Sequence, residues 1–356
     1  MTRGRSALWQ GALRRLAGTA EWLTTPLLPD DYLTLLNPLW AAREPRARVE
    51  AVRPETAEAA TIVLRPGRHW RPHRPGQWTR IRVDIDGVRH WRTFSLSSPP
   101  RTDGLVTITV KAAGLVSGHL VRSLRPGTIV GLACPEGEFV LPDPPPARLL
   151  FLTAGSGITP VRAMLHGLPA EASDVVLIHS APAREDVIFG VELRDLAARR
   201  PGLRLYERHT RYDGRLGPAG VADLCPDWAE RTAFACGPAA MLAAAAEHWA
   251  AHRVPLRVER FHPVLRPPSG GDGGRVRFLR SGRETEADGR TPLLAAGEEA
   301  GALLPSGCRM GICRSCLGRL ASGRVRDLRT GRLHGEVGDL IQTCVSAAAG
   351  TVEIDL

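Results

Sequence analysis

The chain has 356 residues, 43% of them hydrophobic, and a formal net charge of +10. It is too long for one hydrophobic core, so we expect two or three globular domains. The charge does not predict a nucleic-acid partner, because the arginines form no long basic block and no aromatic residues are interleaved with them. The sequence contains no run of about 18 apolar residues, so it predicts no membrane span.

The first 45 residues form an extension that precedes the predicted domains. Apolar residues from Trp9 to Leu23 recur at helical spacing and are accompanied by arginines. A basic amphipathic helix of this kind can lie on an anionic membrane surface. A second possibility stays open, in which this helix only packs across the next domain.

Residues 46–145 contain short alternating strands separated by turn residues. Asp86-Gly87 lies between two such runs, at 80–85 and 88–96, and this arrangement is a hairpin signal. Several short strands at this spacing predict an antiparallel β-barrel.

One motif in this barrel carries a family resemblance. Arg92-Thr-Phe94-Ser95 resembles the Arg-x-Tyr/Phe-Ser motif of the ferredoxin–NADP reductase superfamily, and the likeness covers about residues 46–262. It implies that Arg92 meets the flavin pyrophosphate, Phe94 flanks the isoalloxazine ring and Ser95 approaches flavin N5. These roles suit the residues, because phosphate binds a bidentate guanidinium and a flat ring needs an aromatic surface. Alone, the motif would also fit a plain strand with an exposed arginine.

A second segment resembles the Gly-x-x-Ser element of the same superfamily. It runs from Lys111 through Gly114 to Ser117. In the family a glycine turn opens a short helix there, and the first amides of that helix bind the pyrophosphate. Members with this domain order that use FMN carry a Gly-Arg-Gly-Gly-Ser stretch instead. Because that stretch is absent, the resemblance favours FAD, with FMN as the alternative.

Residues 146–262 change to a β/α rhythm that predicts a doubly wound α/β domain. A buried-type strand runs into Gly155 and Gly157 and then into an apolar helix. Glycines between a strand and a helix let a pyrophosphate approach the helix N-terminus. Together with Thr159 and Pro160, this loop looks like the pyridine-nucleotide loop of the superfamily.

A third element of this domain is Cys236-Gly237-Pro238, which precedes a helix-forming run at 239–251. It resembles the family element whose thiol lies beside the nicotinamide ring. Ser95 and Cys236 are therefore the candidate catalytic residues. The alternative for Cys236 is a small buried residue at the end of a strand.

Three arginines bear on the choice of nicotinamide nucleotide. Arg184, Arg208 and Arg211 follow the second and third predicted strands of this domain, a region that faces the adenosine ribose in relatives. Guanidinium groups there favour a 2′-phosphate. We therefore expect NADPH, with NADH and ordinary solvated arginines as the alternative.

Residues 263–274 are rich in proline and glycine and predict a linker to a last domain at 275–356. That domain holds a Cys-x4-Cys-x2-Cys loop followed by a distant cysteine, the spacing that holds a [2Fe–2S] cluster in plant-type ferredoxins. The predicted ligands are Cys308, Cys313, Cys316 and Cys344. The domain resembles a plant-type ferredoxin, which implies an α+β β-grasp fold.

Two other interpretations of the cysteines are open. A structural zinc site uses four cysteines, but its ligands usually form two separated pairs, whereas three share one loop here. Disulfides are disfavoured because the total of seven cysteines is odd and no signal peptide is visible. We therefore expect a protein of the reducing cytoplasm, with a peripheral position at the inner face of the membrane as the second option.

The three modules together predict an NAD(P)H-dependent reductase that passes electrons through FAD and a [2Fe–2S] cluster to an acceptor protein. The extension from Trp22 to Trp40 looks like that of actinobacterial reductases that serve di-iron acyl-lipid desaturases. We rank a desaturase first, an oxygenase or hydroxylase second and a cytochrome P450 third. We expect a monomer. A redox-sensing binding protein is the alternative of a different class.

Overall fold

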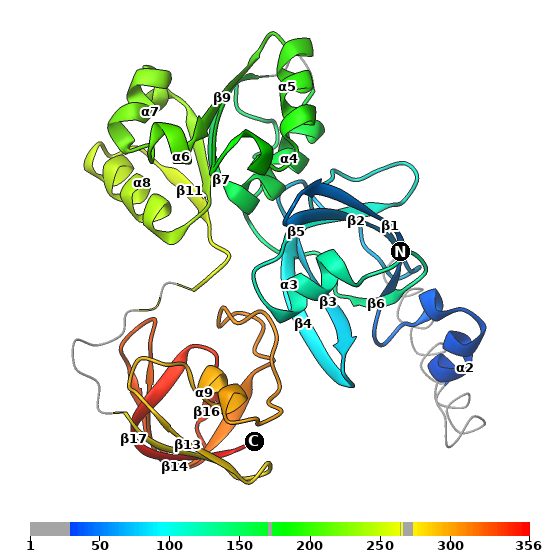
Figure 1. Ribbon diagram of the computed structural model, residues 1–356, viewed down its shortest axis with the longest axis vertical. Coiled ribbons are helices and arrows are strands. Elements are labelled where there is room, and N and C mark those ends of the chain that lie inside the picture. The colour runs from blue at the N-terminus through cyan, green and yellow to red at the C-terminus, as the bar shows by residue number, and fades with distance from the viewer. Residues whose placement is uncertain (1–28, 170–172, 264, 266–272) are drawn as a thin grey trace, which may run out of the picture.

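A computed structural model describes residues 29–169, 173–263, 265 and 273–356. Three sheets follow one another along the chain, each with its own core (Figure 1). The predicted helix from Trp9 to Leu23 lies outside the described residues. Within them, no helix is both long and apolar enough to cross a membrane.

The first sheet is antiparallel and closes into a barrel-like flavin domain. Its strand order is β4-β3-β6-β1-β2-β5, and a bridge between Leu96 and Ile108 joins its two edges. The strands are β1 (Arg46–Thr56), β2 (Ala59–Pro66), β3 (Trp78–Ile85), β4 (Val88–Ser95), β5 (Val106–Lys111) and β6 (Ile129–Leu132). The helix α3 (Leu115–Arg122) buries Val116 and Leu120 in the barrel core. This confirms the predicted antiparallel barrel.

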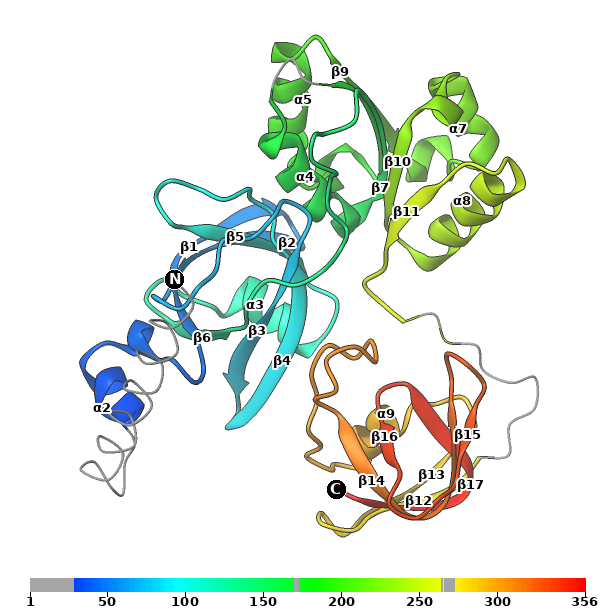
Figure 2. The same ribbon diagram turned by 180° about the vertical axis from the view of Figure 1, so that it is seen from behind.

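A short helical segment precedes the barrel. It consists of α2 (Pro29–Leu36) and the 3-10 turn η1 (Pro38–Trp40), which begins where the Asn37 side chain accepts a hydrogen bond from the Leu39 amide at 3.0 Å. Leu35 and Leu36 are 78% and 77% exposed. In both views α2 lies on the side of the barrel away from the nucleotide domain (Figures 1 and 2).

The second sheet is parallel and forms the nucleotide domain. Its order is β11-β10-β7-β8-β9, with strands β7 (Arg148–Ala154), β8 (Asp174–Ala181), β9 (Leu203–His209), β10 (Thr232–Cys236) and β11 (Leu256–Glu259). Its helices are α4 (Ile158–Gly167), α5 (Gly190–Arg199), α6 (Thr210–Asp213), α7 (Pro218–Leu224) and α8 (Ala239–Ala251), and its 3-10 turns are η2 (Gly155–Gly157), η3 (Arg184–Asp186) and η4 (Trp228–Glu230).

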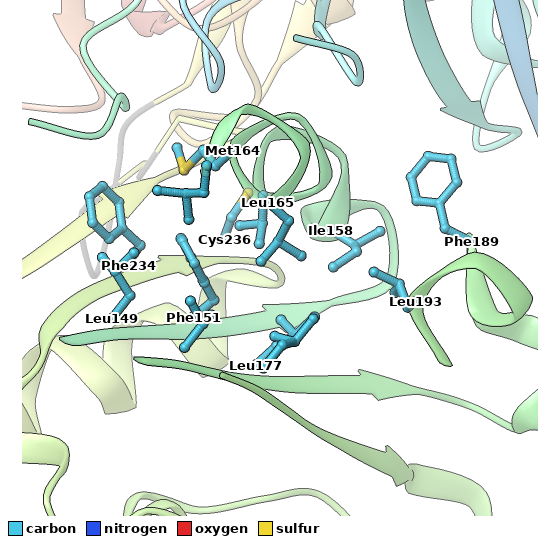
Figure 3. Packing of buried hydrophobic residues seen from close by; sticks show 14 of the residues in the cluster. Leu149, Phe151, Ile158, Met164, Leu165, Leu177, Phe189, Leu193, Phe234 and Cys236 are labelled. Carbon is cyan, nitrogen blue, oxygen red and sulfur yellow. The ribbon is translucent and has the colours of Figure 1, made fainter. Parts of the chain in front are cut away.

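Both faces of this sheet are covered, which explains why its strands are almost continuously apolar. Along β7, Leu149 and Phe151 pack under α4, whereas Leu150 and Leu152 pack against the α7 and α8 side. Figure 3 shows the α4 face, with Leu149 and Phe151 beneath the helix. The observed arrangement confirms the doubly wound α/β domain.

The third sheet is mixed and belongs to the ferredoxin domain. Its order is β13-β12-β17-β14-β15, and β16 pairs with β14. The elements are β12 (Gly274–Phe278), β13 (Arg283–Ala287), α9 (Leu293–Glu299), β14 (Leu317–Asp327), β15 (Leu333–His334), β16 (Leu340–Gln342) and β17 (Ser346–Asp355). Leu293 and Ala296 of α9 pack on the sheet. A single helix on a mixed sheet agrees with the predicted α+β module.

Candidate flavin, nucleotide and cluster sites

One cavity of about 1170 Å³ lies where the three domains meet. Strand β4 and the start of α3 line it from the flavin domain, and the loop after β7 and the segment after β11 line it from the nucleotide domain. The cysteine loop lines it from the ferredoxin domain, through residues that include Cys308, Met310 and Ile312. All three predicted cofactor sites therefore border one space.

The predicted flavin residues of β4 all line this cavity. Ser95 is 4% exposed, and its Oγ has no hydrogen-bond partner among the described residues. Burying a hydroxyl without a hydrogen-bond partner costs free energy, so we expect the Ser95 Oγ to bond to a polar atom at the edge of a bound ring. Arg92 is partly buried, and burial, followed by the like charge of Arg309, lowers its pKa to about 10. Phe94 adds apolar surface beside them. These residues fit a flavin.

The second flavin segment forms the turn that begins α3. The Ser117 Oγ accepts hydrogen bonds from the amides of Ala113 and Gly114, each at 3.0 Å. The hydroxyl thus shapes the turn before any ligand binds. Lys111 lies 3.4 Å from Glu58 in an exposed ion pair. Lys111, Gly114 and Ser117 all line the cavity.

The nucleotide loop packs tightly against the end of β10. Gly155 has φ +52°, and a Cβ on Gly157 would lie 2.0 Å from the Cys236 carbonyl oxygen. The backbone of Cys236 therefore leaves no room for a side chain at position 157. Thr159 lines the cavity and its Oγ1 donates to the Ser156 carbonyl at 2.9 Å.

Gly237 and Pro238 continue β10 into α8, opposite the same loop. A Cβ on Gly237 would lie 3.2 Å from the Ala154 amide nitrogen. Pro238 is the N-cap of α8, and Pro160 is buried in the first turn of α4. The two predicted motifs of this domain thus form one structural unit.

Cys236 is buried among apolar side chains rather than on the cavity wall. It is 0% exposed and lies with Met164 and Leu165 of α4 on one face of the sheet (Figure 3). Burial, together with the charge of Glu259, raises the pKa of its thiol. The proximity of Cys236 to a nicotinamide ring remains a prediction.

Glu259 is a site residue that the sequence did not single out for a role. It pairs in register with Cys236 and lines the cavity. Its Oε2 is buried without a hydrogen-bond partner among the described residues, and burial raises the pKa of its carboxyl to about 8. Such a perturbed carboxyl in a cavity is a feature of functional sites.

Of the three predicted ribose-side arginines, Arg184 follows β8 and Arg211 follows β9, whereas Arg208 lies within β9, near its end. The strands β8 and β9 are neighbours in the sheet. The Arg211 amide donates to the Pro182 carbonyl at 2.9 Å, so its loop lies against the one that holds Arg184. The Arg208 guanidinium donates to the carbonyls of Asp213 and Gly214, at the end of α6. The Arg211 guanidinium lies 4.0 Å from Glu185 and 3.8 Å from Asp186. The loops of Arg184 and Arg211 therefore meet, beside two acidic residues.

The four predicted cluster ligands form two pairs. The Cys308 amide lies 3.2 Å from the Cys313 Sγ, and the Cys313 amide lies 3.4 Å from the Cys308 Sγ. The Sγ atoms of Cys316 and Cys344 are 3.2 Å apart. In the described part of the chain, no three metal-ligating side chains gather as one group. Two thiolate pairs are what two irons require, so the donor set fits a [2Fe–2S] cluster.

A side-chain bridge that the sequence did not predict joins the flavin and nucleotide domains. The Arg162 Nη1 donates to the Ser97 carbonyl at 2.5 Å, while its Nε and Nη2 donate to Glu192 at 2.7 and 2.9 Å. His166 reaches the same carboxylate at 2.6 Å. Burial works against ionisation of Glu192, but these partners hold its pKa at about 2. Arg162 also lies 4.6 Å from the ring centroid of Phe189.

Family models confirm the three domains in this order. An oxidoreductase FAD-binding domain matches residues 65–141, an oxidoreductase NAD-binding domain matches 151–247, and a 2Fe-2S iron-sulfur cluster binding domain matches 276–349. An "NADPH oxidoreductase" of Mycobacterium tuberculosis is 50% identical over 97% of this chain and 92% of its own length. The chain belongs to the NAD(P)H-dependent flavin and iron–sulfur reductases.

Other members of this reductase family are components of oxygenases. The ferredoxin reductase component of a 3-ketosteroid-9-alpha-monooxygenase from Mycolicibacterium smegmatis is 33% identical over 81% of this chain and 83% of its own. Phthalate dioxygenase reductase is similar in fold, with a TM-score of 0.62, 22% identity and coverage of 87% of this chain and 97% of that one. FAD, a [2Fe–2S] cluster and NAD(P)H are therefore the cofactors of the reductase.

Proposed function

We propose that this reductase carries electrons from NADPH to an oxygen-activating protein, most specifically to a di-iron fatty-acyl desaturase. The electron-transfer class follows from the family. The observation that carries the proposal is the shared cavity, because the flavin residues of β4 and the cysteine loop line the same space. The cluster would thus be the nearest acceptor for electrons that leave the flavin.

The residues of the chain have distinct proposed tasks. Arg92 holds the flavin pyrophosphate by a charge-assisted contact, and Ser95 supplies a hydrogen bond to the ring. Cys308, Cys313, Cys316 and Cys344 hold the cluster. Bound FAD supplies the conversion between two-electron and one-electron chemistry, which belongs to the cofactor rather than to a side chain.

NADPH is the proposed electron donor. Arg184 and Arg211 come from neighbouring loops at the carboxyl edge of the sheet, where the ribose is expected. The relative with 50% identity is named an NADPH oxidoreductase. Glu185 and Asp186 lie beside Arg211, and their negative charges would repel a 2′-phosphate. The preference for NADPH therefore requires that the attraction of the guanidinium groups exceeds this repulsion. A kcat/KM for NADH above that for NADPH would reverse this assignment.

Two observations bear on the acceptor. The segment from Trp22 to Trp40 resembles that of desaturase reductases, and its described part presents Leu35 and Leu36 to solvent, as docking at a membrane-bound acceptor would require. The names of other relatives, such as a glycine betaine monooxygenase reductase subunit of Pseudomonas aeruginosa, favour the alternative of an oxygenase.

The deciding experiment is reconstitution with purified acceptors. The loaded reductase and NADPH are mixed with a di-iron acyl desaturase in liposomes, with a Rieske-type oxygenase and with a cytochrome P450, and acceptor reduction is followed under argon. We expect the desaturase to be reduced fastest. Faster reduction of either other acceptor contradicts the desaturase assignment but leaves the reductase class intact. Ferricyanide reduction reports on the flavin site in every mixture.

A further inference from the structure

Arg329 lies behind the cysteine loop, in the turn that follows β14. Its Nη1 donates to the Gly311 carbonyl at 3.0 Å, and its Nη2 donates to the Gln342 Oε1 at 3.0 Å. The Gln342 Nε2 donates to the same Gly311 carbonyl at 2.9 Å. Two side chains, one from the turn after β14 and one from β16, thus bind one carbonyl in the middle of the loop.

Gly311 is the residue that makes this contact possible. It has φ +72°, and a Cβ there would lie 2.4 Å from the Arg329 Nη1 and 3.1 Å from Val345. The loop therefore follows the surface of the guanidinium closely, between the ligands Cys308 and Cys313. A glycine is needed for both the backbone angle and the approach.

Arg329 lies against the loop that carries Cys308 and Cys313, through its hydrogen bond to the Gly311 carbonyl. Its pKa is raised chiefly by the hydrogen-bonded Asp327. Asp327 binds it in a bidentate manner, with contacts of 3.2 and 2.7 Å. The Asp327 side chain is 12% exposed and that of Arg329 is 32% exposed. This ion pair is therefore a partly buried electrostatic element next to the metal site.

We propose that Arg329 and Asp327 set the reduction potential of the cluster, the arginine raising it and the aspartate lowering it. Reduction adds one electron, and so one negative charge, to the iron–sulfur centre. A nearby guanidinium stabilises that charge, whereas a carboxylate destabilises it. The inference rests on the cluster assignment and concerns residues that are not ligands.

The two charges predict shifts of opposite sign, which a purely structural role would not produce. In the loaded full-length protein, Arg329→Gln should lower the midpoint potential, and Asp327→Asn, which keeps an oxygen for the turn amides, should raise it. We expect each to change the reduction equilibrium about threefold to tenfold, which is about 28 to 59 mV for one electron. Arg326→Gln is the matched control, because Arg326 donates to the Gly331 carbonyl at 3.2 Å on the same strand end. It should leave the potential unchanged.

The measurement is a redox titration followed by the electron paramagnetic resonance signal of the reduced cluster. Opposite shifts in the two variants support the proposal. Shifts of the same sign, or no shift in Asp327→Asn, overturn it. If Arg329→Gln fails to retain iron, Asp327→Asn and the charge-conserving Arg329→Lys decide the question, because the first should shift upward and the second should stay near the wild type. Loss of iron from wild type and all variants alike would instead contradict the cluster assignment and hence the proposed function.

Discussion

The flavin and nucleotide domains are joined differently from the flavin and ferredoxin domains. Arg162 connects the first two directly, through hydrogen bonds to Ser97 on one side and Glu192 on the other. The ferredoxin domain meets the flavin domain around the cavity, where Arg92 is coupled electrostatically to Glu298 and Arg309. Hydride transfer needs reacting atoms about 3 to 3.5 Å apart and so benefits from a fixed bridge. A single electron can move between two centres that share no atom. The contact between the flavin and ferredoxin domains can therefore be looser.

The largest effect should come from removing the cluster alone. Cys344→Ala deletes one partner of the Cys316 pair, so the protein should lose its iron and its reduction of the acceptor. NADPH-dependent ferricyanide reduction should remain near the wild-type rate, because flavin and nucleotide residues lie on other domains. Iron analysis and steady-state kinetics test this. Loss of both activities would show that the ferredoxin domain is needed to hold the flavin domain together.

The next effect concerns flavin retention. Arg92→Ala removes a charge-assisted contact worth about 1.5 to 3 kcal/mol, so the Kd for FAD should rise by roughly ten- to a hundredfold. The cluster should be retained, because its ligands are all in the last domain. Fluorescence of released FAD gives the Kd. An exposed arginine without a role, such as Arg253, provides the matched control, and an unchanged Kd for Arg92→Ala would remove this residue from the flavin site.

The bridge between the first two domains should affect catalysis more than nucleotide affinity. Arg162→Ala leaves the Ser97 carbonyl without its donor and leaves Glu192 with His166 as its remaining partner, which should lower the free energy of unfolding by about 1 to 3 kcal/mol. The proposed sites for the flavin ring and the nicotinamide ring would then no longer be fixed relative to each other. The kcat for ferricyanide reduction should therefore fall, while the KM for NADPH changes little. Arg204→Ala, at an exposed ion pair with Asp174, is the control. A raised KM with an unchanged kcat would mean that Arg162 acts on nucleotide binding.

The last effect is the pH dependence of stability that Glu259 contributes. Its pKa rises from the ordinary value of 4.5 to about 8 in the folded protein, so folding favours the protonated carboxyl. This contribution is fully present below the unfolded value and is lost as pH rises toward 8. The unfolding free energy of the protein without bound flavin should therefore decline between about pH 5 and 8. Denaturant titrations of Glu259→Gln should show a flatter profile, and equal slopes would contradict the assignment.

Much of the fold was predictable because its signals are local. Asp86-Gly87 indicated a hairpin, and both residues indeed have positive φ between the paired Ile85 and Val88. The run 239–251 coincides with helix α8. The cysteine spacing indicated the cluster without any knowledge of the tertiary structure. In each case neighbouring residues carry the information.

The electrostatic elements of the site were not predictable from such patterns. Arg162 meets Glu192 and Ser97, which lie 30 and 65 positions away in the chain. Arg329 is one basic residue among 47, and only the fold places it behind Gly311. Glu259 ends an ordinary strand, and only the fold places its carboxyl in the wall of the cavity. Such contacts arise from tertiary packing, to which a single sequence gives no direct access.

The arginine bias has a practical consequence at Lys111. It is the only lysine in the chain, and it lies on the wall of the cavity, with its side chain 39% exposed. A reagent that acylates amines will therefore attach at this one side chain, apart from the terminal amine. A dye placed there would sit beside the cavity, and its emission would report on cofactor loading without any engineered cysteine that could interfere with cluster assembly.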